Sequence, residues 1–150
     1  MKWSVRRVLP GIVLALIAIQ FVPVPRSNPP AETEIAAPDP VRAVLRRACY
    51  DCHSGETVWP LYSRVAPVSW LVAYDVQEGR AELNFTAWNR TRADERSKKF
   101  AKIWKEVAEG DMPPWYYRIA HRDAGLSAED RTRLRAWTAG VRPGKEGTLR

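Results

Sequence analysis

Residues with sulfur or imidazole side chains are scarce in this 150-residue sequence, which has two cysteines, two histidines and two methionines. The cysteines, Cys49 and Cys52, lie so close together that a disulfide framework spread over the fold is excluded. No set of serine, histidine and acid suited to hydrolysis is visible, and the carboxylates show no paired spacing. We therefore do not expect an enzyme.

Strand patterns and a strong charge are also missing. No alternation of apolar and polar residues is long enough to predict a strand. The formal net charge is +7, but Lys2, Arg6 and Arg7 precede an apolar run and fit a targeting segment. Without those three of the 24 basic residues, 21 remain against 17 acidic ones. Because no recognition motif accompanies this small excess, we expect no nucleic-acid partner.

The amino-terminal segment predicts export. Residues 8–24 carry no charge and follow the basic flank, which is the layout of a signal sequence. No small-residue cleavage site follows, since the chain continues as Phe21-Val22-Pro23-Val24-Pro25-Arg26. We therefore expect residues 1–25 to form an uncleaved signal anchor that crosses the inner membrane once, with the remaining chain on the periplasmic side. A cleaved signal is the alternative, because about 17 apolar residues are the lower limit for a span.

Composition divides the rest of the chain into three parts. Residues 26–39 are rich in proline and predict an extended tether that forms no packed element. Residues 40–142 are expected to form one folded domain, and residues 143–150 a flexible tail.

Helical spacing of apolar residues predicts four helices in the domain, which is therefore expected to be all α. The first begins at Asp39-Pro40 and the second runs from Pro67 to Gly79. The third ends at Gly110, and the last begins at Ser127, where Asp130 forms a variant capping box. The expected apolar faces are Val41, Val44, Leu45 and Ala48; Val68, Leu71, Val72 and Val76; Phe100, Ile103, Trp104, Val107 and Ala108; and Leu134, Trp137 and Val141. The expected solvated face of the third helix holds Arg96, Lys98, Lys99, Lys102 and Lys105.

The segment Cys49-Tyr50-Asp51-Cys52-His53 matches the C-x-x-C-H attachment sequence for c-type haem. Two thiols at this spacing can add to the two vinyl groups of a haem, and the adjacent imidazole then reaches the iron from the same side. A dithiol redox pair and half a zinc site are the competing interpretations. Zinc needs four good ligands and only His121 remains, while the α/β pattern of a thioredoxin-like pair is absent. We therefore predict one covalently attached haem c with His53 as the proximal iron ligand.

The second axial ligand has three candidates. Met112 is the only methionine besides Met1, and it lies in Gly110-Asp111-Met112-Pro113-Pro114, where prolines stiffen the chain after a helix stop. We favour Met112 as the distal ligand. His121 is the alternative ligand, and an open position is the third possibility.

Flat apolar walls are needed around a porphyrin, and the sequence has seven tryptophans. Arg64 or Arg80 could pair with a haem propionate. The candidate pocket residues are Trp59, Tyr62, Trp70, Trp104 and Trp115.

The sequence resembles a family of small exported haem-binding domain proteins that is related to the mono-haem cytochromes c. The resemblance covers about residues 41–139. It implies a small cytochrome c-like helical domain around one covalently bound haem, with His53 as the proximal and Met112 as the distal ligand. In such domains the first helix crosses the last. The matching residues are Cys49-Tyr50-Asp51-Cys52-His53-Ser54, Trp59-Pro60, Tyr62-Ser63, Ala66-Pro67-Val68-Ser69-Trp70, Asp75-Val76, Gly79-Arg80, Asn84-Phe85, Trp88 and Met112-Pro113-Pro114.

These observations predict a one-electron carrier, anchored by its amino-terminal membrane helix, that exchanges electrons with redox partner proteins of the inner membrane or periplasm. A haem-based ligand sensor or peroxidase-like protein with a labile or open distal position is the alternative. A haem-bearing module that binds a larger complex through its basic helix is a third hypothesis.

Overall fold

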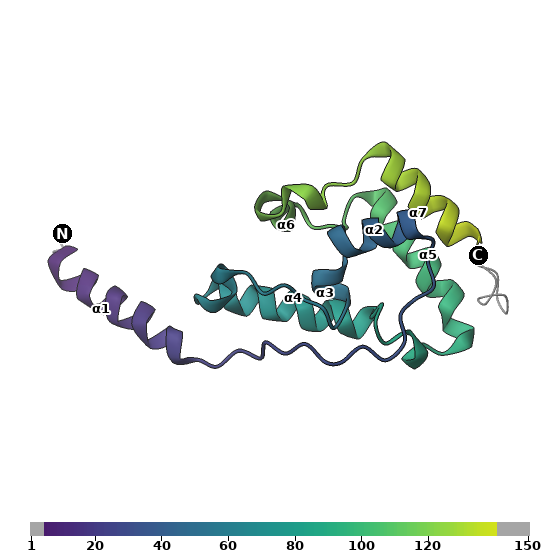
Figure 1. Ribbon diagram of the computed structural model, residues 1–150. Coiled ribbons are helices and arrows are strands. Elements are labelled where there is room, and N and C mark those ends of the chain that lie inside the picture. The colour runs from purple at the N-terminus through teal and green to yellow at the C-terminus, as the bar shows by residue number, and fades with distance from the viewer. Residues whose placement is uncertain (1–4, 141–150) are drawn as a thin grey trace.

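The computed structural model describes residues 5–140, with side chains from residue 8 onward. These residues form seven α-helices and no strand, which confirms the prediction of an all-α fold. The helices are α1 (Val5–Ala18), α2 (Asp39–Ala48), α3 (Tyr50–His53), α4 (Val68–Glu82), α5 (Ala93–Glu109), α6 (Trp115–Ala120) and α7 (Ala128–Gly140) (Figure 1). Short 3-10 helices lie at Ile19–Phe21, Leu61–Arg64, Trp88–Arg90 and Arg122–Ala124. The expected tail at 143–150, Val141 and the start of the basic flank lie outside the described residues.

The apolar amino-terminal segment forms a shorter helix than we predicted. α1 has 14 residues, roughly 21 Å at 1.5 Å per residue, whereas the hydrocarbon core of a bilayer is about 30 Å thick. Beyond α1, the Gln20 amide pairs with the backbone of Ala66 (Nε2 to O 3.2 Å, Oε1 to N 2.9 Å). Within residues 5–140 no helix is long and apolar enough to span a membrane. The prediction of a single-pass inner-membrane protein with its domain on the periplasmic side is therefore wrong, because the charge-free run is longer than the helix it forms.

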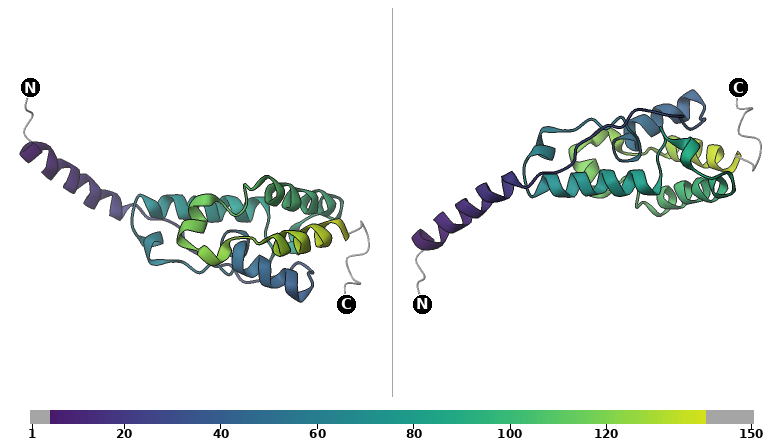
Figure 2. Two further views of the ribbon diagram at one scale, coloured as in Figure 1. Left: turned by 90° about the horizontal axis from the view of Figure 1, so that it is seen from above. Right: turned by 90° about the horizontal axis from the view of Figure 1, so that it is seen from below.

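Residues 22–38 are extended and lie along the domain (Figure 1), whereas Asp39, the last residue of the predicted tether 26–39, begins α2. The backbone of Thr33 forms a parallel bridge with Ala87, and the Ile35 N–H donates to the carbonyl of Phe85 at 2.8 Å. Ile35 is only 2% exposed and Ala37 is 8% exposed. The segment expected to contain no packed element thus contributes two side chains to the core. Figure 2 shows it between α1 at one end of the molecule and α7 at the other.

The core forms where α2 and α5 both pack against α7. The ring of Phe100 contacts Trp137 edge to face, with centroids 5.0 Å apart, and Trp88 at 5.4 Å. The predicted apolar face of α2 is entirely buried. The core side chains are Ile35, Ala37, Val41, Val44, Leu45, Tyr50, Phe85, Trp88, Phe100, Ile103, Val107, Leu134 and Trp137.

Both predicted signals at the ends of α5 and α7 are confirmed. Gly110 ends α5 with φ of +87°, in the left-handed region that favours glycine. At the start of α7 the Ser127 N–H and hydroxyl donate to Asp130 Oδ2, both at 2.9 Å, and the Asp130 N–H donates to the Ser127 hydroxyl at 3.1 Å. This reciprocal pairing is the variant capping box that the sequence predicts.

Candidate functional site

Three side chains of the C-x-x-C-H segment lie on one turn of helix. The amide N–H groups of Cys52 and His53 donate to the carbonyl of Cys49 at 3.2 and 2.9 Å, which closes the short helix α3. Residues three and four positions apart share one face of a helix. The two thiols and the imidazole therefore belong to the same face of α3.

Glycine allows α4 to approach this turn closely. A Cβ atom added to Gly79 would lie 2.5 Å from the Cys52 carbonyl oxygen and 3.1 Å from Cys52 Cβ. No side chain can be accommodated there without moving backbone atoms. Gly79 thus brings the carbonyl groups of α4 within reach of His53.

The hydrogen bonds of His53 define its tautomer. Its Nδ1 lies 2.8 Å from the carbonyl oxygen of Gly79 and 3.1 Å from that of Leu83. Carbonyl oxygens only accept hydrogen bonds, so Nδ1 carries the proton and Nε2 presents a lone pair. Burial lowers the pKa of His53, although these two carbonyls oppose the shift. The neutral ring, oriented by backbone carbonyls, has the arrangement typical of a histidine that binds a metal through Nε2.

A cavity of about 300 Å³ adjoins this turn. Its floor is apolar, with Leu83 and Phe85 on one side and Ile103 and Val107 of α5 on another. Phe85 is nearly fully buried and contacts the His53 ring at 6.0 Å between centroids. The candidate residues that line this cavity are Cys49, Cys52, His53 and Met112.

Met112 is carried to the cavity by the end of α5. The N–H groups of Gly110, Asp111 and Met112 all donate to the carbonyl of Glu106, the last two at 3.0 and 3.2 Å. This turn places Met112, followed by Pro113 and Pro114, along the cavity wall. Met112 is half-buried. The structure therefore brings the favoured distal residue to the cavity that His53 lines.

Both thiols are hard to ionise. Burial raises the pKa of Cys49 to about 12, with a further contribution from the charge of Cys52. Burial also raises the pKa of Cys52 to about 12, assisted by Asp75 and Asp51. A redox-active dithiol needs a lowered thiol pKa. These environments therefore argue against the dithiol interpretation of the motif.

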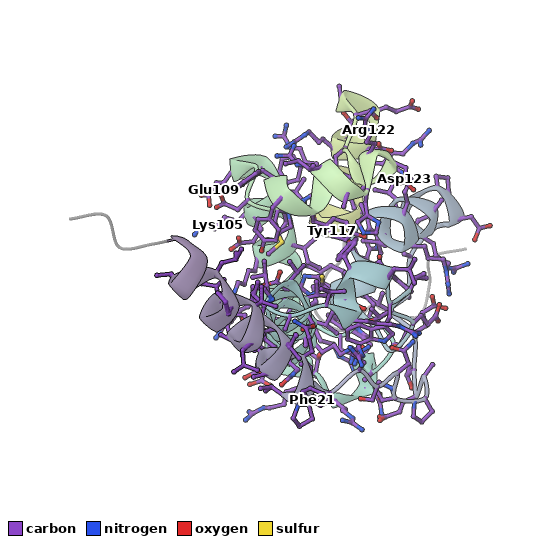
Figure 3. The ribbon with its side chains drawn as sticks, turned by 90° about the vertical axis from the view of Figure 1, so that its left-hand side faces the viewer. Phe21, Lys105, Glu109, Tyr117, Arg122 and Asp123 are labelled. Carbon is purple, nitrogen blue, oxygen red and sulfur yellow. The ribbon has the colours of Figure 1, made fainter. Side chains whose placement is uncertain are left out.

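His121 lies at a second cavity, of about 270 Å³. Its Nε2 is 2.7 Å from the hydroxyl of Tyr62, and its ring stacks on Tyr117 with centroids 4.2 Å apart. Tyr117, labelled in Figure 3, donates in turn to Asp51 Oδ2 at 2.7 Å. The predicted apolar face of α4 (Val68, Leu71, Val72 and Val76) lines this second cavity. Met112 thus lines the cavity of His53 and His121 lines the neighbouring one, and the two cavities share a wall formed by Asp51, Cys52, Asp75, Tyr116 and Tyr117.

None of the five predicted aromatic pocket residues lines the cavity of His53. Trp59 donates to Asn28, Tyr62 faces the second cavity, and Trp104 packs against the core. Trp70 and Trp115 are 38% and 67% exposed. Composition indicated that aromatic residues are abundant, but it carries no information on which faces of the helices meet.

The arginines expected near a propionate also lie elsewhere. Arg64 is exposed. The guanidinium of Arg80 donates to the carbonyls of Ser54 and Ser27, both at 2.7 Å, and to the side chains of Asn28 and Thr57. Arg80 therefore links the extended amino-terminal segment to the domain through hydrogen bonds.

Several residues of the cavity wall were not predicted. Phe85 is one of the residues that match the family, but it was not assigned to the pocket. Tyr116 and Tyr117 belong to α6, a helix too short to show a periodic pattern. Lys99 and Lys102 line the cavity although we expected both on the solvated face of α5. Their spacing of three residues places them on the side of α5 that carries Ile103 and Glu106.

The donor set suits a prosthetic group. Among residues 5–140 no cluster of three or more histidine, cysteine or acidic side chains could hold a metal ion by itself. One imidazole and one thioether can instead fill the two axial positions of an iron whose other ligands come from a porphyrin. The apolar floor and the two adjacent thiols fit the same group.

Comparison with known proteins gives one match. A family model described as a haem-binding domain matches residues 14–140. No curated protein and no solved structure matches the chain.

Proposed function

Since the chain belongs to the haem-binding domain family, we propose that its haem is a haem c, held by Cys49 and Cys52 and ligated by His53 and Met112, and that the protein is a one-electron carrier. Haem is the cofactor that the family implies. We propose in addition the covalent attachment, the two iron ligands from the protein and the electron transfer.

One observation carries the proposal: the two thiols, the imidazole and the thioether line a single cavity. The imidazole is already in the tautomer that leaves Nε2 free, because Nδ1 donates to the carbonyls of Gly79 and Leu83. Four side chains of the three types found in a mono-haem c-type site thus converge from Cys49 and α3 and from the turn after α5.

Attachment requires no oxidant or reductant. Each thiol would add across one vinyl group of the haem, with the sulfur bonded to the carbon next to the ring and the hydrogen to the terminal carbon. Cys49 and Cys52 are free in the structure and half-buried at the cavity wall.

The protein supplies the environment for electron exchange. Bound haem supplies a one-electron couple between ferrous and ferric iron. Phe85, Ile103 and Val107 provide an apolar wall that excludes water. Thioether ligation by Met112 would hold the reduction potential higher than a second histidine would. We expect redox proteins as partners and no substrate turnover.

The fold supports likeness to a cytochrome c domain. α2, which precedes the attachment motif, packs against α7, the last helix. The buried residues Val44 and Leu45 of α2 share a core with Leu134 and Trp137 of α7. This contact corresponds to the crossing of first and last helices that the resemblance implies.

Covalent attachment is tested on protein made in cells that carry a haem c attachment system. We expect haem-dependent peroxidase staining to survive on a denaturing gel, and the intact mass to include one haem. A Cys49→Ala/Cys52→Ala variant should lose the stain. Free thiols and no added mass in the mature wild-type chain would contradict the proposal.

The distal ligand is tested by spectroscopy of the oxidised protein. We expect the weak red absorption band of iron bound to a thioether, its loss in Met112→Ala, and its retention in the control variant His121→Ala. Rapid carbon monoxide binding to the ferrous wild-type protein would argue for the sensor or peroxidase-like alternative.

A further inference from the structure

Two lysines lie at the edge of the cavity. Lys99 and Lys102 occur three residues apart on α5 and both line the cavity that His53 lines. The side chain of Lys99 is 25% exposed and that of Lys102 is 51% exposed. Lys102 is exposed as predicted and Lys99 is partly buried, and both are placed to meet a molecule that fills the cavity.

The charges around the cavity are unevenly distributed. Among the residues that the structure describes, the cationic side chains that line it are these two lysines, beside five carboxylates. Haem carries two carboxylates of its own, the propionates, and like charges at close range repel. Within this lining, the two lysines are therefore the side chains that would attract a propionate edge. The five carboxylates are Asp51, Asp75, Glu78, Glu82 and Glu106.

Glu82 shows that both lysines can hold a carboxylate. Lys99 Nζ lies 3.2 Å from Glu82 Oε1 and donates to the Glu82 carbonyl oxygen. Lys102 Nζ donates to Glu82 Oε2. One carboxylate, that of Glu82, is thus bound by the ammonium groups of both lysines.

The attachment chemistry agrees with this placement. Vinyl groups and propionates lie on opposite edges of a haem. Cys49 and Cys52 would hold the vinyl edge at α3, so the propionate edge would lie away from α3. The lysines come from a different helix, α5, and meet Glu82 at the end of α4.

We propose that Lys99 and Lys102 bind the haem propionates and so determine the orientation of the porphyrin in the cavity. This inference rests on the proposed function, and adds to it a recognition site for the carboxylate edge of the cofactor. On haem binding the two lysines exchange part of their contact with Glu82 for the propionates.

The test compares two ligands that differ only in their carboxylates. Ferric mesohaem has ethyl groups in place of vinyl groups, so it cannot form thioethers, and its dimethyl ester also lacks the two charges. Binding of each to the apoprotein is titrated by absorbance. We expect the wild-type protein to bind mesohaem roughly tenfold more tightly than the ester, since two partly exposed ion pairs are each worth a few-fold.

Variants assign this preference to residues. Lys99→Gln/Lys102→Gln should bind both ligands equally. The matched control is Lys105→Gln, on the same helix, whose ammonium group lies 3.9 Å from Glu109 and does not line the cavity (both labelled in Figure 3). It should keep the tenfold preference. Glu82→Gln should tighten mesohaem binding several-fold without changing ester binding, because it removes the competing carboxylate.

Three outcomes would contradict the lysine site. Equal binding of the two ligands by the wild-type protein, or a preference that survives in the double lysine variant, overturns the lysine site and leaves the haem proposal intact. Failure of the wild-type protein to bind either ligand also overturns the lysine site, whereas the proposed function itself is contradicted by free thiols and no added haem mass in the mature chain. A helical circular dichroism spectrum of each variant shows that the fold is retained.

Discussion

At Gly79, the absence of a side chain determines how closely two helices approach. The position lies inside α4, where alanine would ordinarily be favoured by roughly 1 kcal/mol. Its missing Cβ, however, would lie 2.5 Å from a backbone oxygen of Cys52. The same residue supplies a carbonyl oxygen that holds the His53 ring. Packing and site geometry therefore both depend on this glycine.

We predict that Gly79→Ala destabilises the protein despite its gain in helix propensity. Overpacking costs about 1–3 kcal/mol, and a backbone contact cannot be relieved by a rotamer change, so we expect a net loss of about 1–2 kcal/mol in the free energy of unfolding. Urea unfolding followed by circular dichroism measures it. Gly140→Ala, whose added Cβ would meet nothing within 4 Å, is the control and should be neutral or stabilising. Equal stability of both variants would contradict the close approach.

Among the helices, α7 depends on a charged cap that ties it to α2. Asp130 accepts hydrogen bonds from Ser127 and from the guanidinium of Arg47, at 2.9 Å. Arg47 also donates to the carbonyls of Asp123 and Gly125. Burial by itself would raise the pKa of Asp130, but the hydrogen bonds from Ser127 and Arg47 outweigh it and lower the pKa.

We predict that Asp130→Asn lowers the free energy of unfolding by about 1–2 kcal/mol at neutral pH, because it removes a charged cap. A carboxylate with a lowered native pKa stabilises the fold above its unfolded pKa, and this stabilisation is lost as the pH falls through the native value. The difference between wild type and variant should therefore shrink in acid, in urea unfolding measured across pH. A difference that stays constant to the lowest pH would contradict it. Glu129→Gln, at an exposed i,i+4 pair with Arg133, should change stability by less than about 0.5 kcal/mol.

Over the whole molecule, the extended amino-terminal segment completes the core. Ile35 packs against the hydrophobic cluster, and the carbonyl of Ala36 accepts a hydrogen bond from the Trp137 indole at 3.2 Å. Gly55 allows the chain to pass, since a Cβ there would lie 2.3 Å from the Pro29 carbonyl oxygen. The wall of the cavity that His53 lines shares Phe85 with this core, so the packing of the segment also supports that wall.

We predict that Ile35→Ala lowers the free energy of unfolding by about 2–4 kcal/mol, as expected for a fully buried aliphatic side chain. The measurement is urea unfolding of the apoprotein. Val22→Ala, in the same segment but with its side chain 51% exposed, should remain within about 0.5 kcal/mol of wild type. If the two variants behaved alike, Ile35 would not belong to the core in solution.

The sequence by itself determined the features that depend on neighbours along the chain. Two thiols and an imidazole within one helical turn, Gly110 at the end of α5 and the Ser127 cap of α7 all follow from spacing. A helix turn or a cap involves residues three or four positions apart, so its signal is local. The first of these features, the Cys49–His53 motif, is also among the residues that carry the family resemblance.

Only the tertiary structure decided which helix faces meet. It placed Met112 at the cavity of His53 and His121 at another, turned Lys99 inward, and buried Ile35 from a segment that its prolines marked as a tether. It also ended α1 short of a membrane span. These outcomes depend on contacts between residues far apart in the sequence, which periodicity and composition do not specify.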